Sequence, residues 1–310
     1  MLDLFILVFP VFGLVAVGYA AALVGAVSSD TTKGLSEFLF TFAAPALIFK
    51  LICAATFPET IPWGYWIAYY SGMGIAWGAS MLVVSKVFGA TRGEAVIAGL
   101  STGQANTVMI GIPIILKAYG DQAAFPIALL LAVNLPITMT VATLMLEGSR
   151  AAGSGAVIAR LVRGLLTHPI LLGIIFGLAA VHWDLRPTGA IATMVDMLAA
   201  CAIPGGLVAL GLALKTYGVR KDLPVAFTVS GFRLLIHPAI TYVVAAHIFA
   251  LPPAWTGAVV LFAAMPAGIN AYLFAARYGE GIGIASTAVA LTTVLSVVTS
   301  MLWLRILGVG

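Results

Sequence analysis

One stretch, residues 103–113, places polar and helix-breaking residues in the middle of an apolar run. Its sequence is Gly-Gln-Ala-Asn-Thr-Val-Met-Ile-Gly-Ile-Pro, and the run from Ala95 to Leu116 is long enough to cross a bilayer. Non-helical backbone at membrane depth is tolerated only where it is packed in protein or lines a watery cavity. The stretch therefore predicts a helix interrupted near the midplane, with polar groups turned toward a solute that passes.

A helix interrupted in this way can bind an anion. The N-terminal end of a half-helix carries partial positive charge and free N–H groups. The side chains of Asn106 and Thr107 add neutral hydrogen bonds. An amide donates to a carboxylate without bringing a full charge into the membrane, so these residue types predict reversible binding of a small organic anion.

The composition is that of a membrane protein. Hydrophobic residues make up 62% of the 310 residues and charged residues only 8%. A soluble domain of this length cannot bury so much apolar surface. The net charge of +4 comes from scattered basic residues, which excludes a nucleic-acid-binding patch. The two cysteines, Cys53 and Cys201, lie in apolar segments and are expected to be free thiols.

Windows of about 20 apolar residues predict an all-α polytopic membrane protein without a soluble domain. Ten transmembrane helices are expected, at residues 4–25, 36–56, 63–88, 94–118, 123–146, 165–183, 193–216, 224–249, 255–277 and 282–307. The first is expected to be a retained helix rather than a signal peptide, because it lacks a basic leader and a cleavage site.

The distribution of Lys and Arg predicts the orientation, because cytoplasmic loops carry the excess of positive charge. With the N-terminus outside, ten basic residues lie inside and three lie outside. The inside residues are Lys33, Lys86, Arg92, Arg150, Arg160, Arg163, Lys215, Arg220, Lys221 and Arg277, and the outside residues are Lys117, Arg186 and Arg305. Both termini are therefore expected outside.

The two halves of the chain are expected to be inverted repeats. A shift of 159 residues superimposes rare residues: Pro10 on Pro169, Pro45 on Pro204, and Tyr119-Gly120-Asp121 on Tyr278-Gly279-Glu280. Each half has five predicted helices, an odd number, so the second half enters the membrane upside down. The predicted organisation is a first five-helix repeat at 1–147, a cytoplasmic central loop at 148–163, and a second, inverted five-helix repeat at 164–310.

The repeat predicts a second interrupted helix, and residues 264–271, Ala-Met-Pro-Ala-Gly-Ile-Asn-Ala, fit that description. Pro266 removes a backbone donor, Gly268 permits non-helical angles, and Asn270 supplies a polar side chain. Either segment alone could be a Pro-kinked packing helix. Both together, at equivalent positions, favour broken and crossing fourth and ninth helices, an arrangement that places substrate sites at the midplane.

Two basic residues lie within predicted helices, Lys50 and Arg233. Charge inside a membrane is costly, so each is a functional candidate. The alternative for Lys50 is an ammonium that reaches the outer interface, and the alternative for Arg233 is a structural contact with a helix end or loop carbonyls. Two acidic residues, Glu37 and Asp196, lie near helix starts, where they are expected to complement the helix dipole.

Several chemistries are excluded by what the sequence lacks. No Asp or Glu lies near the centre of a predicted helix, which argues against a sodium–proton antiporter. No phosphate-binding loop and no metal-ligand spacing occurs, so no cofactor and no metal is expected. No pair of nucleophile and base is visible either, so the chain is not expected to be an enzyme.

Two segments resemble signatures of the auxin efflux carrier family, which includes plant PIN proteins and bacterial organic-acid carriers. Asn106–Pro113 with Lys117-Ala118-Tyr119-Gly120 resembles the family's helix-4 signature, and Ala264–Gly268 with Tyr278 resembles its helix-9 counterpart. Plant members usually have Pro at the position of Ala105, and many have a long hydrophilic central loop that is missing here. The ten-helix layout extends the resemblance over the whole chain.

The resemblance implies a scaffold of the first, second, sixth and seventh helices and a mobile domain of the others. It also implies elevator-type alternating access, export of a carboxylate-bearing substrate, and a homodimer through the scaffold helices. On this layout Pro45 and Lys50 belong to the scaffold and face the crossing, and Asn106 contacts the carboxylate. The candidate substrate-binding residues are Gln104, Ala105, Asn106, Thr107, Gly111, Pro113, Pro266, Gly268, Asn270, Lys50, Pro45 and Arg233.

The expected function is an efflux carrier for a small organic anion, such as auxin or a mono- or dicarboxylate, in the cytoplasmic membrane. The expected partners are this anion and the lipid bilayer. Two alternatives stay open. One is a sodium-coupled organic-anion symporter of the bile-acid type, to which Gln104, Asn106, Thr107 and Asn270 could supply ligands. The other is a membrane sensor or structural subunit that transports nothing.

Overall fold

The computed structural model describes residues 2–55, 62–147, 167–217 and 222–309. Within these residues the chain is helical and contains no strand, so the predicted all-α class is confirmed. Seven of the described helical segments are long and apolar enough to cross a membrane. The number of crossings and the inverted relation of the halves stay predictions. The predicted central loop, 148–163, lies outside the described residues.

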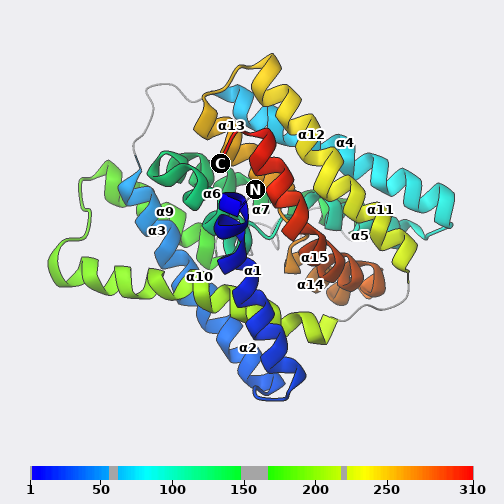
Figure 1. Cartoon of the computed structure of the whole chain (residues 1–310), viewed down its shortest axis with the longest axis horizontal. Coiled ribbons are helices and arrows are strands. Elements are labelled where there is room, and N and C mark those ends of the chain that lie inside the picture. Colours follow the sequence, from blue (N-terminus) through cyan, green and yellow to red (C-terminus); the bar gives the residue numbers. More distant parts are fainter. Residues whose placement is uncertain (1, 56–61, 148–166, 218–221, 310) are drawn as a thin grey trace. The chain divides into compact units, whose positions relative to one another are not determined.

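The helices follow the predicted ranges closely (Figure 1). Their bounds are α1 Leu2–Leu23, α2 Ser29–Phe38, α3 Ala44–Ala54, α4 Trp63–Phe88, α5 Arg92–Gly103, α6 Ile112–Tyr119, α7 Ala124–Glu147, α9 Pro169–His182, α10 Gly189–Tyr217, α11 Leu223–Gly231, α12 His237–Tyr242, α13 Pro253–Ala264, α14 Ile269–Tyr278 and α15 Ile282–Ile306. Four π-helical turns connect some of them: η1 Leu39–Ala43, η2 Thr107–Gly111, η4 Phe232–Ile236 and η5 Val243–Ile248. A 3₁₀ turn, η3 Gly120–Ala123, precedes α7.

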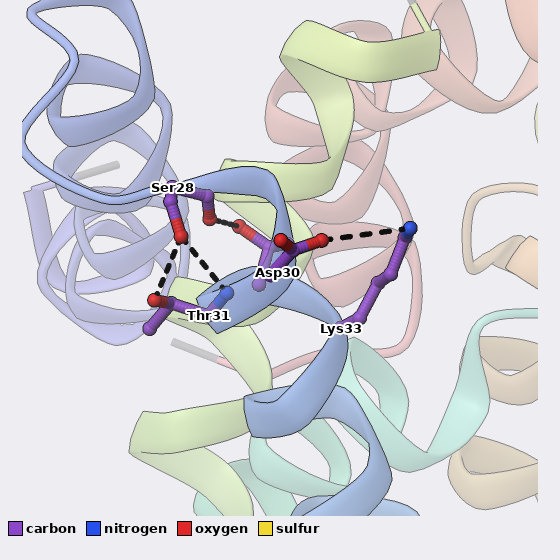
Figure 2. A network of polar contacts seen from close by, with 5 residues as sticks. Ser28, Asp30, Thr31 and Lys33 are labelled. Carbon is purple, nitrogen blue, oxygen red and sulfur yellow. Dashed lines mark hydrogen bonds and ion pairs between the residues drawn. The ribbon is translucent and has the colours of Figure 1, made fainter.

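Short polar sequences start and stop these helices. Figure 2 shows the start of α2, where the Ser28 side chain accepts a hydrogen bond from the Thr31 amide at 3.1 Å. Thr91 and Glu94 form a reciprocal capping box at the start of α5. At the end of α4, Gly89 adopts a left-handed conformation, which glycine adopts at little cost.

Contacts divide the chain into two compact units. Unit 1 comprises residues 1–12, 59–119 and 214–310, and unit 2 comprises residues 13–58 and 120–213. Each unit therefore takes segments from both predicted repeats, whose boundaries stay a prediction. The division follows the grouping implied by the family resemblance except at two helices. The first half of α1, up to Phe12, belongs to unit 1, and α7 belongs to unit 2, where it packs on α3 and α9.

Unit 1 is built around α13, whose residues Ala258–Ala264 are fully buried. The long helix α4 packs against α5 and α12, and Figure 1 shows α4 and α12 side by side in cyan and yellow. Gly99 and Gly103 of α5 lie against the Trp77 side chain, where any larger residue would overlap the ring. The last turn of α5 is thus held tightly where the helix stops.

Unit 2 depends on close backbone approach between helices. Gly173 on α9 faces the backbone of Pro45, and Gly177, one turn later, faces Ile52. Small residues four apart let helix backbones approach closely in membranes. Gly18 on α1 and Gly211 on α10 make a second such approach, because each faces the backbone of the other helix. The contacts of α9 with α3 and of α1 with α10 in unit 2 are therefore close backbone approaches that glycine permits.

Replacement of Gly173 by Leu should destabilise the protein. A Cβ at Gly173 would lie 2.7 Å from the carbonyl oxygen of Pro45, so α9 would have to move away from α3. Overpacking of this kind costs about 1–3 kcal/mol. A lowered midpoint of thermal unfolding in detergent would report it.

Gly74→Leu is the matched control, because Gly74 is a helical glycine on α4 with no neighbouring atom within 4 Å of an added Cβ. The control should unfold at or above the wild-type midpoint. Equal midpoints for the two variants would show that α3 and α9 do not approach as described.

Candidate functional site

The structure interrupts both predicted helices within unit 1. Helix α5 ends at Gly103 and the π-helical turn η2 begins at Thr107, while α13 ends at Ala264 and α14 begins at Ile269. The residues between them are extended. Two polar segments that the sequence placed within apolar runs are therefore the points at which regular helix stops.

The two extended segments pair with each other through the backbone. Ala105 and Ala267 form an isolated antiparallel bridge. The Asn106 amide donates to the Pro266 carbonyl at 2.8 Å, and the Gly268 amide donates to the Gln104 carbonyl at 2.8 Å. Backbone groups freed by the breaks in this way satisfy one another, which a water-poor environment requires.

Glycine and proline occupy positions that need them. A Cβ at Gly268 would lie 2.9 Å from the Ala105 carbonyl oxygen, so only glycine fits against the partner segment without a shift. Pro266 lies in the break itself, where no helical N–H is required. Pro113 lies in the first turn of α6, where its missing donor would be unsatisfied anyway. Gly111 lies beside Thr107 and Met265.

Asn106 and Thr107 lie at the start of η2, which continues into α6, and both are buried, with exposed fractions of 7% and 3%. The Asn106 Nδ2 and Thr107 Oγ1 atoms have no hydrogen-bond partner among the described residues. An unpaired buried polar group costs about 1–3 kcal/mol, so such atoms ordinarily have a partner. Both side chains stand at a helix N-terminus, which favours negative charge.

Arg233 is fully buried and donates to the carbonyl ends of both broken helices. Its Nε donates to Met265 O at 2.7 Å, and its Nη1 donates to Thr102 O at 2.9 Å and to Gly103 O at 3.2 Å. A longer bond joins Nη2 to Phe262 O at 3.4 Å. The guanidinium thus occupies the negative ends of α5 and α13, where a cation is favourable.

His237 completes the surroundings of Arg233. Its Nδ1 lies 3.0 Å from Arg233 Nη1, and its ring packs on Tyr69 of α4 with 5.0 Å between centroids. Because Nη1 carries two hydrogens and donates to carbonyls on one side, Nδ1 is best placed as an acceptor on the other. A direct contact between Arg233 and a substrate stays a prediction, since the guanidinium contacts described above are all with the protein.

The remaining candidates divide between the units. Gln104 is buried beside Gly268, and Asn270 is half-buried in the first turn of α14, both in unit 1. Pro45 and Lys50 belong to unit 2, on α3. Lys50 Nζ lies 2.7 Å from Asp196 Oδ1 on α10, so Asp196 is the partner of this lysine rather than a helix cap. Unit 1 therefore holds ten of the twelve predicted residues.

Two contributors were not found by sequence reasoning. The Thr292 hydroxyl on α15 accepts a hydrogen bond from the Ala267 amide at 3.0 Å and so holds the second extended segment in place. The Trp303 indole donates to the Leu234 carbonyl at 2.8 Å, within the π-helical turn that carries Arg233. A Thr and a Trp in an apolar helix carry no local signal of these contacts, which depend on packing between distant segments.

The chemistry of the site follows from its helix ends. The negative carbonyl ends meet a buried guanidinium, while Asn106 Nδ2 and Thr107 Oγ1 at the amide end of η2 have no hydrogen-bond partner among the described residues. The arrangement can therefore accept an anion through neutral donors, with a positive charge nearby. It offers no described group of Asp, Glu, His or Cys that could hold a metal ion.

Comparison with known proteins gives the family. A family model described as "Membrane transport protein" matches residues 3–304. A Rhizobium meliloti (strain 1021) protein named "Putative malonate transporter" is 28% identical over 309 residues, covering 96% of this chain and 94% of the relative. A Methanothermobacter thermautotrophicus (strain Delta H) protein named "Uncharacterized transporter" is 24% identical over 296 residues, covering 96% of each.

The family match extends over nearly the whole chain and includes both interrupted helices. The resemblance seen in the two signatures is thereby confirmed. The relatives named above are transporters, in agreement with the expectation that the chain is not an enzyme. The chain belongs to the membrane transport protein family, the PIN-like auxin efflux family, and is a multi-pass membrane transporter.

Proposed function

We propose that this protein is a secondary carrier that exports a small organic anion across the cytoplasmic membrane and binds it at the crossing of the two broken helices. One observation carries the proposal. The Asn106 amide and the Thr107 hydroxyl are buried at a helix N-terminus and have no partner among the described residues. Buried donors without partners at a positive helix end are what a carboxylate requires.

The proposed binding mode uses neutral donors in the first contact and a cation behind them. A carboxylate accepts hydrogen bonds from Asn106 Nδ2, from Thr107 Oγ1 and from amides of the first turn of η2. Hydrogen bonds to an ionised acceptor are about twice as strong as neutral ones. Arg233 holds the carbonyl ends away from the anion and compensates its charge. On this proposal Arg233 is a positioning residue rather than a direct ligand.

The proposed substrate is a mono- or dicarboxylate, with malonate as the first to test. The name of the Rhizobium meliloti relative mentions malonate, and that relative aligns over almost the full length of both chains. A dicarboxylate leaves its second group for another donor, and Asn270 and Gln104 are the nearest polar side chains by sequence to the breaks. Auxin and other monocarboxylates are the competing substrates.

The proposed mechanism is alternating access, in which unit 1 carries the site and unit 2 is the scaffold. Ten helices in two inverted five-helix repeats, both termini outside and dimerisation through unit 2 complete this proposal. The grouping of compact units supports it, because unit 1 contains both interrupted helices and the helices that pack on them. A sodium-coupled symporter and a non-transporting sensor are the competing outcomes of the experiments below.

Binding of the substrate should stabilise the purified protein. A ligand that binds only the native state raises its stability by about 2.7 kcal/mol at one hundred times its dissociation constant. Thermal unfolding in detergent, measured with malonate, acetate and indole-3-acetate at constant ionic strength, should therefore show a raised midpoint with one carboxylate class. The same carboxylate should then cross the membrane of proteoliposomes that contain the protein.

Sodium separates the alternatives in that experiment. A midpoint shift that needs sodium would replace the proposal with the symporter. Stabilisation without flux in proteoliposomes would favour the sensor.

Asn106→Ala should weaken carboxylate binding by roughly 10- to 150-fold, because a hydrogen bond to a charged group contributes about 1.5–3 kcal/mol. Asn106→Asp should abolish binding through repulsion of the anion. Midpoint shifts against carboxylate concentration measure both effects.

Ser101→Ala is the control, since that buried hydroxyl donates to Ile97 O within its own helix. Unchanged affinity in Asn106→Ala would reduce the first break to a kink.

Arg233→Gln should lower the free energy of unfolding by several kcal/mol, because each buried carbonyl left without its charged donor costs about 1–3 kcal/mol. Arg233→Lys keeps the charge but loses the planar fork, so it should recover only part of the stability. Thermal midpoints without ligand give the comparison.

Arg277→Gln removes a basic residue from the same unit at an exposed position on α14 and should unfold like wild type. An Arg233→Gln variant as stable as Arg277→Gln would show that the hydrogen bonds from Arg233 to the carbonyl ends of α5 and α13 do not stabilise the protein.

A further inference from the structure

Unit 2 contains a cavity of about 230 Å³ whose lining is mostly apolar but includes three charged side chains. It lies among α3, the first turns of α10 and the connection between α9 and α10. The charged residues are Lys50, Arg186 and Asp196, and Cys53 is also in the wall. Pockets for drug-sized ligands run from about 300 to 1,000 Å³, so this cavity suits a smaller molecule.

The packing of unit 2 fixes the positions of these charges. Gly173 and Gly177 let α9 approach α3, which carries Lys50. At the end of α9, the Leu185 amide donates to Ala180 O at 2.8 Å, so the turn that precedes Arg186 is closed by the backbone. The residue that follows Arg186 is Pro187, which removes further backbone freedom. Arg186 is therefore presented by an ordered connection.

The charges of the cavity sum to +1. Lys50 and Arg186 are cations, and Asp196 is the one acidic side chain in the described lining. Lys50 and Asp196 pair at 2.7 Å, but their side chains are 50% and 55% exposed. Exposed pairs contribute little net energy, so a second anion can compete for the ammonium. Arg186 forms no ion pair with the described residues, and its planar fork matches a carboxylate.

We infer that this cavity is a second anion site, for a small carboxylate bound between Arg186 and Lys50. Arg186 supplies the bidentate contact, and Lys50 is shared between Asp196 and the ligand. The inference does not rest on the proposed site at the helix crossing, because the cavity lies entirely within unit 2. On this inference Lys50 binds a carboxylate in the cavity of unit 2, rather than at the helix crossing in unit 1.

A second Lys–Asp pair of the same unit offers a comparison with the pair in the cavity, Lys50 and Asp196. Lys33 and Asp30 lie 3.8 Å apart on α2, with side chains 77% and 90% exposed (Figure 2). They are three residues apart on an open helix surface and are not in the lining of this cavity. Lys33→Gln is therefore a matched control that removes a paired lysine of unit 2 without touching the proposed site.

The two cysteines allow the site to be tested without transport. Cys53 is in the cavity wall and partly exposed, whereas Cys201 on α10 is exposed and not in the lining. In the full-length Cys201→Ser protein, the rate at which a small uncharged maleimide modifies Cys53 should fall as malonate or acetate is added. The fall should be about twofold at half occupancy. Chloride at equal ionic strength should leave the rate unchanged.

Variants in this background locate the effect. Arg186→Gln should abolish protection of Cys53, and Asp196→Asn should shift half-protection to a lower carboxylate concentration, because the competing carboxylate is gone. In the Lys33→Gln and Asn106→Ala variants, carboxylates should protect Cys53 as strongly as in the parent protein. Elution as a single species in size-exclusion chromatography checks that each variant is folded.

Several results would overturn the inference. One is a rate of Cys53 modification that does not change with any carboxylate. Equal protection by chloride is another, since it would show charge screening alone. Protection lost in Asn106→Ala would place the effect at the helix crossing, and the same protection of Cys201 in the Cys53→Ser protein would show a global change. Protection in a protein that fails to transport would still support the site, so the two proposals fail separately.

Discussion

The structure of unit 1 depends on the placement of one guanidinium at two helix ends. Two helices that stop inside an apolar body leave carbonyl groups without helical partners, and water is scarce there. Arg233 reaches the last carbonyls of α5 and α13 with hydrogen bonds of 2.7–3.4 Å. The extended segments then satisfy each other across the bridge between Ala105 and Ala267. With both demands met, the breaks can persist.

The same arrangement separates the two kinds of helix end. Carbonyl ends are covered by a cation and by neighbouring helices, whereas the amide end at Thr107 keeps buried donors without partners among the described residues. Had the carbonyl ends been left open, their negative potential would oppose an anion at the amide ends a few residues away. The contacts of Arg233 with the carbonyl ends are thus a condition for the proposed anion site as well as for the fold.

The sequence predicted those features that have a local cause. Proline, glycine and asparagine within apolar runs indicated both breaks to within a few residues, and hydrophobic windows located the helices. The partners of Arg233 could not be predicted, because Thr102 lies 131 positions away and only packing brings them together. Contact with carbonyl groups was one of the two alternatives for Arg233. The residue type alone does not tell a structural arginine from one that binds a ligand. Asp196 suggested a helix cap for the same reason, since Lys50 is distant in sequence.

The burial of Arg233 also has an electrical consequence. It is the one fully buried Lys, Arg, Asp or Glu among the residues that the structure describes, and it belongs to unit 1. On the proposed mechanism, a monoanion bound in unit 1 neutralises the buried charge of Arg233. Without a bound anion, the buried part of unit 1 carries this one positive charge. A membrane potential does work of about 2.3 kcal/mol per charge per 100 mV. The voltage-sensitive step of the cycle would then be the return of the empty carrier, and a dianion would make the loaded step electrogenic as well.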